Sequence, residues 1–146
     1  MSQPSALPSR LAHISLAVND AEEVAALYET LLGATVRTRE TLEDRGLRVI
    51  FINVAGVPIE LVQPINPEDE SNPVAKYLKK QGEGIHHLAF QVADARAALS
   101  HARASGAELV DAEPRPGADG CQVAFLHPRS TAGALIEFVE KPSSNS

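Results

Sequence analysis

The sequence predicts an α+β fold in which two tandem βαβββ modules form a curved eight-stranded mixed sheet, with the helices outside. The stretches that begin at His13 and His87 resemble each other at a spacing of about 74 residues. Each is followed by an Ala-rich helical run that ends at a glycine. Each module closes with Ile-Glu and an apolar residue, at Glu60 and at Glu137. Such a repeat indicates two copies of one supersecondary unit that share a core.

The first module is expected over residues 11–64. A strand at 13–18 precedes Asp20, which fits an N-cap because Glu23 follows at the spacing of a capping box. Apolar residues then recur at helical spacing until Gly33 supplies a stop. Strands at 36–40, 47–54 and 58–63 complete the module, with a polar turn at 41–46 between the first two.

A linker over residues 65–82 separates the modules and has no counterpart in the repeat. Asn72 followed by Pro73 resembles an N-cap with proline at the first helical position, so a short helix is expected at 74–81. The second module, 83–141, should repeat the order of the first. Its strands are predicted at 85–92, 107–112, 121–126 and 134–140, and its helix at 95–105. A longer loop at 127–133 distinguishes it.

Composition narrows the classes of function. The chain has 146 residues and a net charge of −6, with acids and bases scattered along it. This balance argues against nucleic acid or an anionic membrane as a partner. The single cysteine, Cys121, has no second cysteine for an internal disulfide. No apolar run approaches a membrane span, and no signal peptide is evident, so we expect a cytoplasmic protein.

Two histidines and two glutamates at equivalent places predict a metal site. His86 and His87 point oppositely along a strand, and the repeat selects His87 because it aligns with His13. Imidazole and carboxylate together suit divalent transition metals, and four ligands leave an open position for a substrate. Taken singly, a histidine in a strand is also typical of a hydrogen-bonded core residue. A glutamate in a strand is also typical of its solvent-exposed face. Because the four residues match between the two modules, the sequence predicts a metal site around which the sheet curves. Its ligands are His13, Glu60, His87 and Glu137.

Three longer segments sharpen the prediction. They are GEGIHHLAF at 82–90, EPRPGADG at 113–120 and VAFLHPRSTAGALIE at 123–137. With the linker at 71–78, they resemble the methylmalonyl-CoA epimerases of the vicinal oxygen chelate superfamily, whose fold is glyoxalase-like. Because that superfamily hosts isomerases, lyases, dioxygenases and drug-sequestering proteins, the long segments are more discriminating than the fold.

The resemblance implies an isomerase that interconverts (R)- and (S)-methylmalonyl-CoA. It would remove the C2 proton and return it through a metal-stabilised enolate. The same four ligands are implied, with Co expected before Mn, Ni or Zn, and a homodimer is implied as well. Some relatives carry a catalytic glutamate where this chain has Val49, which cannot move a proton. We therefore take Glu137 and Glu43 as candidates for the acid/base groups.

An acyl-CoA substrate carries phosphates that require cations. Its contacts are expected at Lys76, on the linker helix, and at His127, Arg129 and Ser130, in the longer loop. Lys79, Lys80 and Arg115 are further cationic candidates. Two alternatives remain open at this point. One is another metal-dependent isomerase or lyase of the same fold, similar to lactoylglutathione lyase, and the other is a metal-free protein that sequesters a small molecule.

Overall fold

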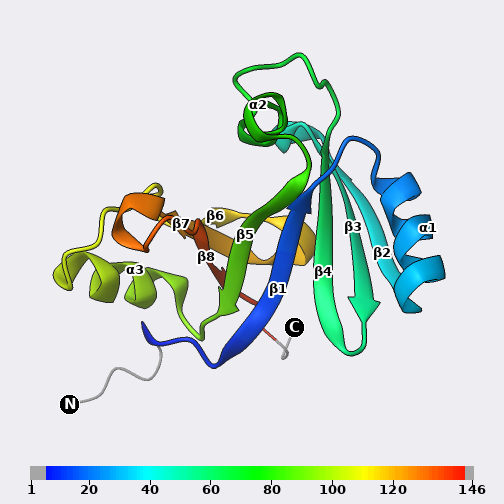
Figure 1. Ribbon diagram of the computed structural model, residues 1–146. Coiled ribbons are helices and arrows are strands. Elements are labelled where there is room, and N and C mark those ends of the chain that lie inside the picture. Colours follow the sequence, from blue (N-terminus) through cyan, green and yellow to red (C-terminus); the bar gives the residue numbers. More distant parts are fainter. Residues whose placement is uncertain (1–5, 144–146) are drawn as a thin grey trace. The chain divides into compact units, whose positions relative to one another are not determined.

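The computed structural model describes residues 6–143 and divides into two units (Figure 1). The N-terminal unit spans His13–His86. The C-terminal unit contains the chain from His87 onward together with the residues up to Ala12. Within the described residues, no helix has the length and apolar content that a membrane crossing would need.

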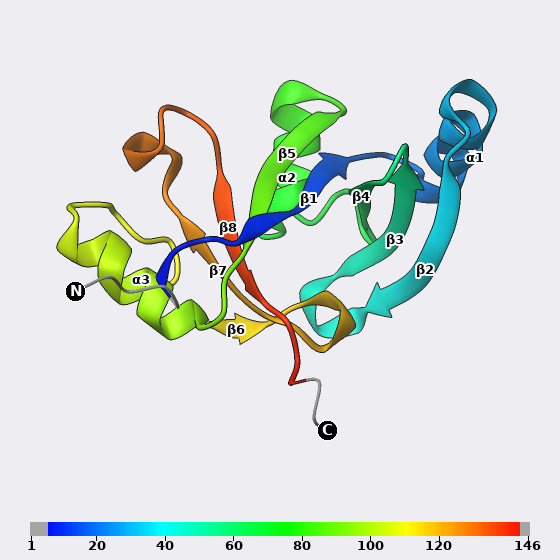
Figure 2. The ribbon, with the colours of Figure 1, turned by 90° about the horizontal axis from the view of Figure 1, so that it is seen from below.

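Four strands make the sheet of the N-terminal unit, in the order β2-β3-β4-β1. β1 (Arg10–Ala17) is parallel to β4 (Val57–Pro64), and β3 (Leu47–Val54) is antiparallel to both β4 and β2 (Thr35–Leu42). β2 is therefore the outer strand of this unit, as the view from below also shows (Figure 2). The predicted strands of the first module are confirmed.

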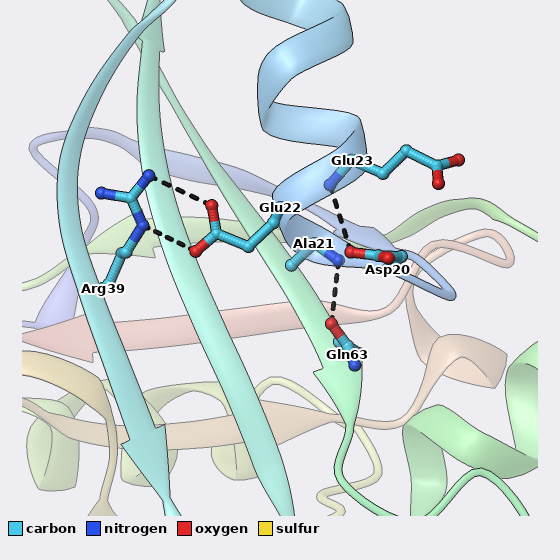
Figure 3. A network of polar contacts seen from close by, with 6 residues as sticks. All are labelled: Asp20, Ala21, Glu22, Glu23, Arg39 and Gln63. Atoms are coloured by element: carbon cyan, nitrogen blue, oxygen red, sulfur yellow. Dashed lines mark hydrogen bonds and ion pairs between the residues drawn. The ribbon is translucent and has the colours of Figure 1, made fainter.

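Helix α1 (Ala21–Leu32) begins and ends where its capping signals predict. Asp20 accepts the N–H of Glu23 at 3.1 Å, and Gly33 takes a φ of 68°, which ends the helix. The N–H of Ala21 also donates to the side chain of Gln63 at 2.8 Å, which ties the helix to β4 (Figure 3). The helix N-terminus is thus anchored to the sheet.

The two faces of this sheet bury different residues. One face packs against α1 and buries Ile50, Ile52 and Leu61. The opposite face buries Ala17, Val49 and Val62 together with Val74 of α2 (Pro73–Gln81). The opposite face also carries His13 and Glu60, because residues that alternate along a strand share a face. It is termed the ligand face below.

Asn72 joins α2 to the turn between β2 and β3. Its side-chain oxygen accepts the N–H groups of Val74 and Ala75 at 2.9 and 3.2 Å, which caps the helix as predicted. Its side-chain nitrogen donates to the carbonyl oxygens of Arg45 and Gly46 at 3.1 and 3.2 Å. The turn itself is a short 3₁₀ helix, Glu43–Arg45. One buried amide therefore holds two segments together.

The C-terminal unit repeats this plan in the order β5-β8-β7-β6. β5 (Gly84–Gln91) is parallel to β8 (Ile136–Glu140), and β7 (Gln122–Leu126) is antiparallel to β8 and to the short β6 (Arg115–Pro116). Helix α3 (Ala95–Ala104) covers one face, where Leu99 packs with Leu126 and Phe138. The opposite face, the ligand face of this unit, buries Ala89, Cys121, Val123 and Val139.

The strand predicted at 107–112 is wrong. This segment meets β7 through an isolated bridge between Leu109 and Leu126 and through the N–H of Val110, which donates to the carbonyl of Phe125 at 2.9 Å. The strand that pairs with β7 is instead Arg115–Pro116, in the predicted loop. The side chain of Asp111 explains the difference, because it accepts the N–H of Phe125 at 2.8 Å. A side chain that accepts a hydrogen bond from a strand N–H competes with the backbone carbonyl that would otherwise accept it from a neighbouring strand. A short 3₁₀ turn at Ala118–Gly120 leads into β7, and another at Pro128–Ser130 follows it.

Candidate active site

A buried histidine–glutamate pair lies on the ligand face of the N-terminal unit. His13 Nε2 is 3.4 Å from Glu60 Oε1, and the two residues are only 7% and 8% exposed. Phe51 is the register partner of Glu60 on β3, and its ring meets that of His13 edge-on at 5.3 Å between centroids. The aromatic contact orients the imidazole beside the carboxylate. The parallel pairing of β1 with β4 and the antiparallel pairing of β3 with β4 bring the three side chains together.

The C-terminal unit builds the same arrangement. His87 Nε2 is 3.0 Å from Glu137 Oε1, and the two residues are 6% and 5% exposed. Phe125 is the register partner of Glu137, and its ring meets that of His87 edge-on at 5.1 Å. Each unit therefore contributes one imidazole and one carboxylate, packed against one phenylalanine, from equivalent strands.

The donor set of each pair fits a divalent transition metal. Burying a carboxylate costs free energy unless a positive or hydrogen-bonding partner compensates it. Imidazole nitrogen and carboxylate oxygen are both ligands of Mn, Co, Ni and Zn. His86, beside His87 in the sequence, instead packs its ring edge-on against Tyr77 at 5.1 Å. Ligation by His13, Glu60, His87 and Glu137 stays a prediction that this geometry supports.

The two acid/base candidates lie in different environments. Glu137 is buried in its pair with His87. Glu43 is exposed at the start of the 3₁₀ turn between β2 and β3, where its carbonyl accepts the N–H of Gly46 at 3.1 Å. Val49 lies on the ligand face and is 1% exposed. The roles of Glu43 and Glu137 stay predictions.

The substrate-binding candidates of the longer loop interact with nearby backbone and side chains. His127 Nδ1 accepts the N–H of Arg129 at 3.0 Å, and Ser130 Oγ accepts the N–H of Glu108 at 2.8 Å. Arg129 also lies 3.3 Å from a carboxylate oxygen of Glu108. Lys76 is exposed on α2. These contacts give the loop a defined shape, and its role in binding stays a prediction.

Sequence reasoning missed a side chain that organises the second pair. Asp111 lies 3.1 Å from Arg115 and accepts the N–H of Phe125. The guanidinium of Arg115 sits over the ring of Phe125, 5.8 Å from its centroid, and that ring packs on His87. Asp111 thus holds Arg115 over Phe125, the ring that packs against the imidazole of His87. A strand was predicted at this position, and no local motif signals the contact.

Comparison with known proteins identifies the family. Residues 12–125 match the Glyoxalase/Bleomycin resistance protein/Dioxygenase superfamily. The ethylmalonyl-CoA/methylmalonyl-CoA epimerase of Cereibacter sphaeroides is 40% identical over 130 residues, which cover 88% of this chain and 95% of that protein. The chain belongs to this superfamily and, within it, to the methylmalonyl-CoA epimerase family.

Solved structures extend the similarity to the fold. The crystal structure of methylmalonyl-CoA epimerase from Mycobacterium tuberculosis has a TM-score of 0.87 and 32% identity, over 99% of this chain and 95% of that one. A methylmalonyl-CoA epimerase in complex with methylmalonyl-CoA and NH4+ has a TM-score of 0.84 and 31% identity, over 94% and 97%. The predicted glyoxalase-like fold class and the predicted family are both confirmed.

Proposed function

We propose that this protein is a metal-dependent epimerase that interconverts (R)- and (S)-methylmalonyl-CoA. The observation that carries the proposal is the buried histidine–glutamate pair that each unit builds from equivalent strands. Similarity to methylmalonyl-CoA epimerases along nearly the whole chain supports this reaction over the lyase and sequestering alternatives. A structure of one such relative with methylmalonyl-CoA supports an acyl-CoA thioester as the substrate.

The chemistry needs little beyond charge stabilisation and proton transfer. The C2 hydrogen lies between a thioester and a carboxylate, so its removal leaves an enolate. His13, Glu60, His87 and Glu137 would hold one divalent cation, and this cation would supply the positive charge that stabilises an enolate. The protein must then deliver a proton to the opposite face of C2. Glu137 and Glu43 are the candidates that the sequence supplies for these transfers.

Burial of the two pairs restricts water at the reacting centre. The rings of Phe51 and Phe125 each meet one imidazole edge-on. Lys76, Arg129 and the loop at 127–133 would meet the CoA portion. A homodimer, a cytoplasmic location and Co as the preferred metal stay predictions.

Proton NMR in heavy water tests the proposed function directly. Purified protein with methylmalonyl-CoA should exchange the C2 hydrogen for deuterium and interconvert the epimers. A chelator should abolish both changes, and Co or Mn should restore them better than Mg, because Mg prefers shells made only of oxygen. A metal-loaded protein that leaves C2 unexchanged would contradict the proposal. Parallel reactions with ethylmalonyl-CoA would show how strictly the methyl group is selected.

A further inference from the structure

The carboxylate of Glu40 lies on the same face of β2 as the ligand face of the N-terminal unit. Its neighbour Arg39 points the other way, because Arg39 makes two bonds of 2.7 and 3.1 Å to Glu22 on α1 (Figure 3). Successive side chains of a strand project to opposite faces. Since Arg39 faces the helix, Glu40 faces away from it.

A β-bulge in β2 produces this orientation. Val36 packs with the α1 side of the sheet, and the register shifts between Val36 and Thr38. Strict alternation from Val36 would turn Glu40 toward α1. The extra residue reverses the alternation for the rest of the strand. Thr38 is then paired with Phe51, and Glu40 with Val49.

The pairing with Val49 places Glu40 on the face that carries the candidate site, with β3 between its strand and that of Glu60. Residues directly opposite on antiparallel strands share a face, and neighbouring strands lie about 4.8 Å apart. Val49 is in turn the register partner of Val62, two residues from Glu60, and Phe51 is the partner of Glu60 itself. On the four strands β1 to β4, Glu40 and Glu60 are the carboxylates that this face carries.

The two carboxylates differ in how deeply they are buried. Glu60 is buried beside His13 and, in the proposed function, neutralises a cation. A carboxylate that compensates a cation is a weak proton acceptor. Glu40 is only partly buried, on the outer strand of the sheet, where its carboxylate can exchange a proton with water. Proton transfer is thus better suited to Glu40 than to Glu60.

We propose that Glu40 is a catalytic acid/base of this enzyme and exchanges the C2 proton on one face of the acyl-CoA substrate. This role rests on the proposed epimerase function. The C2–H bond breaks, its electron pair enters the thioester to give the enolate, and the proton passes to a carboxylate oxygen of Glu40. A second group protonates C2 from the opposite face, and both groups regain their starting states by exchange with water.

The decisive experiment measures C2 exchange and epimerisation separately in heavy water, with each epimer as the starting material. Glu40→Gln should slow epimerisation by at least about 100-fold, the usual scale for a lost general base. Exchange should stop for one epimer and continue for the other, because the second group still acts on its own face. Metal content, thermal unfolding and the Kd for methylmalonyl-CoA should stay at wild-type values.

Matched variants complete the test. Glu29→Gln makes the same chemical change on an exposed site of α1 and should leave turnover unchanged. Glu40→Asp keeps a carboxylate with a shorter reach and should retain more activity than Glu40→Gln. Wild-type turnover by Glu40→Gln would overturn the role of Glu40, most directly if Glu43→Gln removed exchange instead. No exchange by wild-type, metal-loaded protein would contradict the proposed function as a whole.

Discussion

The two units bury the same histidine–glutamate–phenylalanine arrangement and differ at their outer strands. In the N-terminal unit, β2 has eight residues and pairs along β3, whereas β6 in the C-terminal unit has two. Across from Val49 stands Glu40, and across from the equivalent Val123 stands Arg115. One position of the repeat therefore carries opposite charges in the two units.

This difference shows which parts of the duplication are constrained. Strands β3, β4, β7 and β8 each pair on both sides and pack against the helix of their own unit. The glutamates and phenylalanines of the two pairs lie on these strands and therefore have the same geometry. An outer strand has one neighbour, and its open side can change without disturbing the core. The two units therefore differ mainly at these outer strands, where one carries the carboxylate proposed above for proton transfer and the other carries a guanidinium.

Loss of either histidine of the pairs should give the largest effect. If both units supply ligands to one ion, His13→Ala and His87→Ala should each lower the metal affinity by more than about 100-fold. Loss of a ligand should weaken binding more than loss of a residue that only supports a ligand, which costs about 10- to 100-fold. Metal analysis and titration of the purified variants measure this loss. His86→Ala, a change of the adjacent histidine, should retain the metal. If only one of His13→Ala and His87→Ala retained the metal, the residues of a single unit would be enough to bind it.

Asn72 should be the next most costly change, because its contacts have no counterpart among the described residues of the C-terminal unit. Asn72→Ala removes a helix cap and two bonds to the β2–β3 turn, so we expect a loss of about 2–3 kcal/mol in the free energy of unfolding. Asp94→Ala, which removes only the cap of α3, should cost about 1 kcal/mol. Urea unfolding measures both, and equal losses would contradict the bridging role of Asn72.

Replacing the cation of the second outer strand should have a smaller effect on binding. Arg115→Gln should raise the KM for methylmalonyl-CoA by about tenfold and change kcat little, since a partly exposed guanidinium contributes less than a buried one. Steady-state kinetics separate the two parameters. Arg96→Gln removes an exposed arginine from α3 and serves as the control. A fall in kcat with an unchanged KM would instead assign Arg115 to positioning His87 through Phe125.

The smallest expected effect concerns the orientation of β2. The hydrogen bond from Arg39 holds the pKa of the Glu22 carboxyl below its ordinary value. Arg39→Gln should return that pKa toward the ordinary value, as NMR titration can measure. A carboxyl whose pKa is lower in the folded than in the unfolded protein stabilises the fold at pH values above its unfolded-state pKa. This stability is lost as the pH falls through the folded-state pKa. The variant should therefore be slightly less stable at neutral pH, and this difference should vanish in acid. An unchanged pKa of Glu22 would show that Arg39 does not face α1. The orientation of Glu40, which is inferred from that of Arg39, would then be wrong as well.

The sequence by itself determined the repeat and the local signals. The matching His13 and His87, with Glu60 and Glu137, predicted one metal site with four ligands. Within each unit the histidine lies beside the glutamate, and ligation of one ion by all four stays a prediction. The caps at Asp20 and Asn72 predicted the starts of two helices, because a capping side chain acts within a few residues. Local physics of this kind can be read without knowing the partners of a strand.

Only the tertiary structure decided which face each outer-strand residue joins. Alternation from Val36 would have assigned Glu40 to the helix side, and the bulge before Thr38 reverses it. Asp111 replaced a backbone bond to β7, so the predicted strand at 107–112 gave way to the short β6 that carries Arg115. Register depends on contacts between strands far apart in the sequence, and one inserted residue turns every later side chain over. The charged residues that distinguish the two units became visible for that reason only in three dimensions.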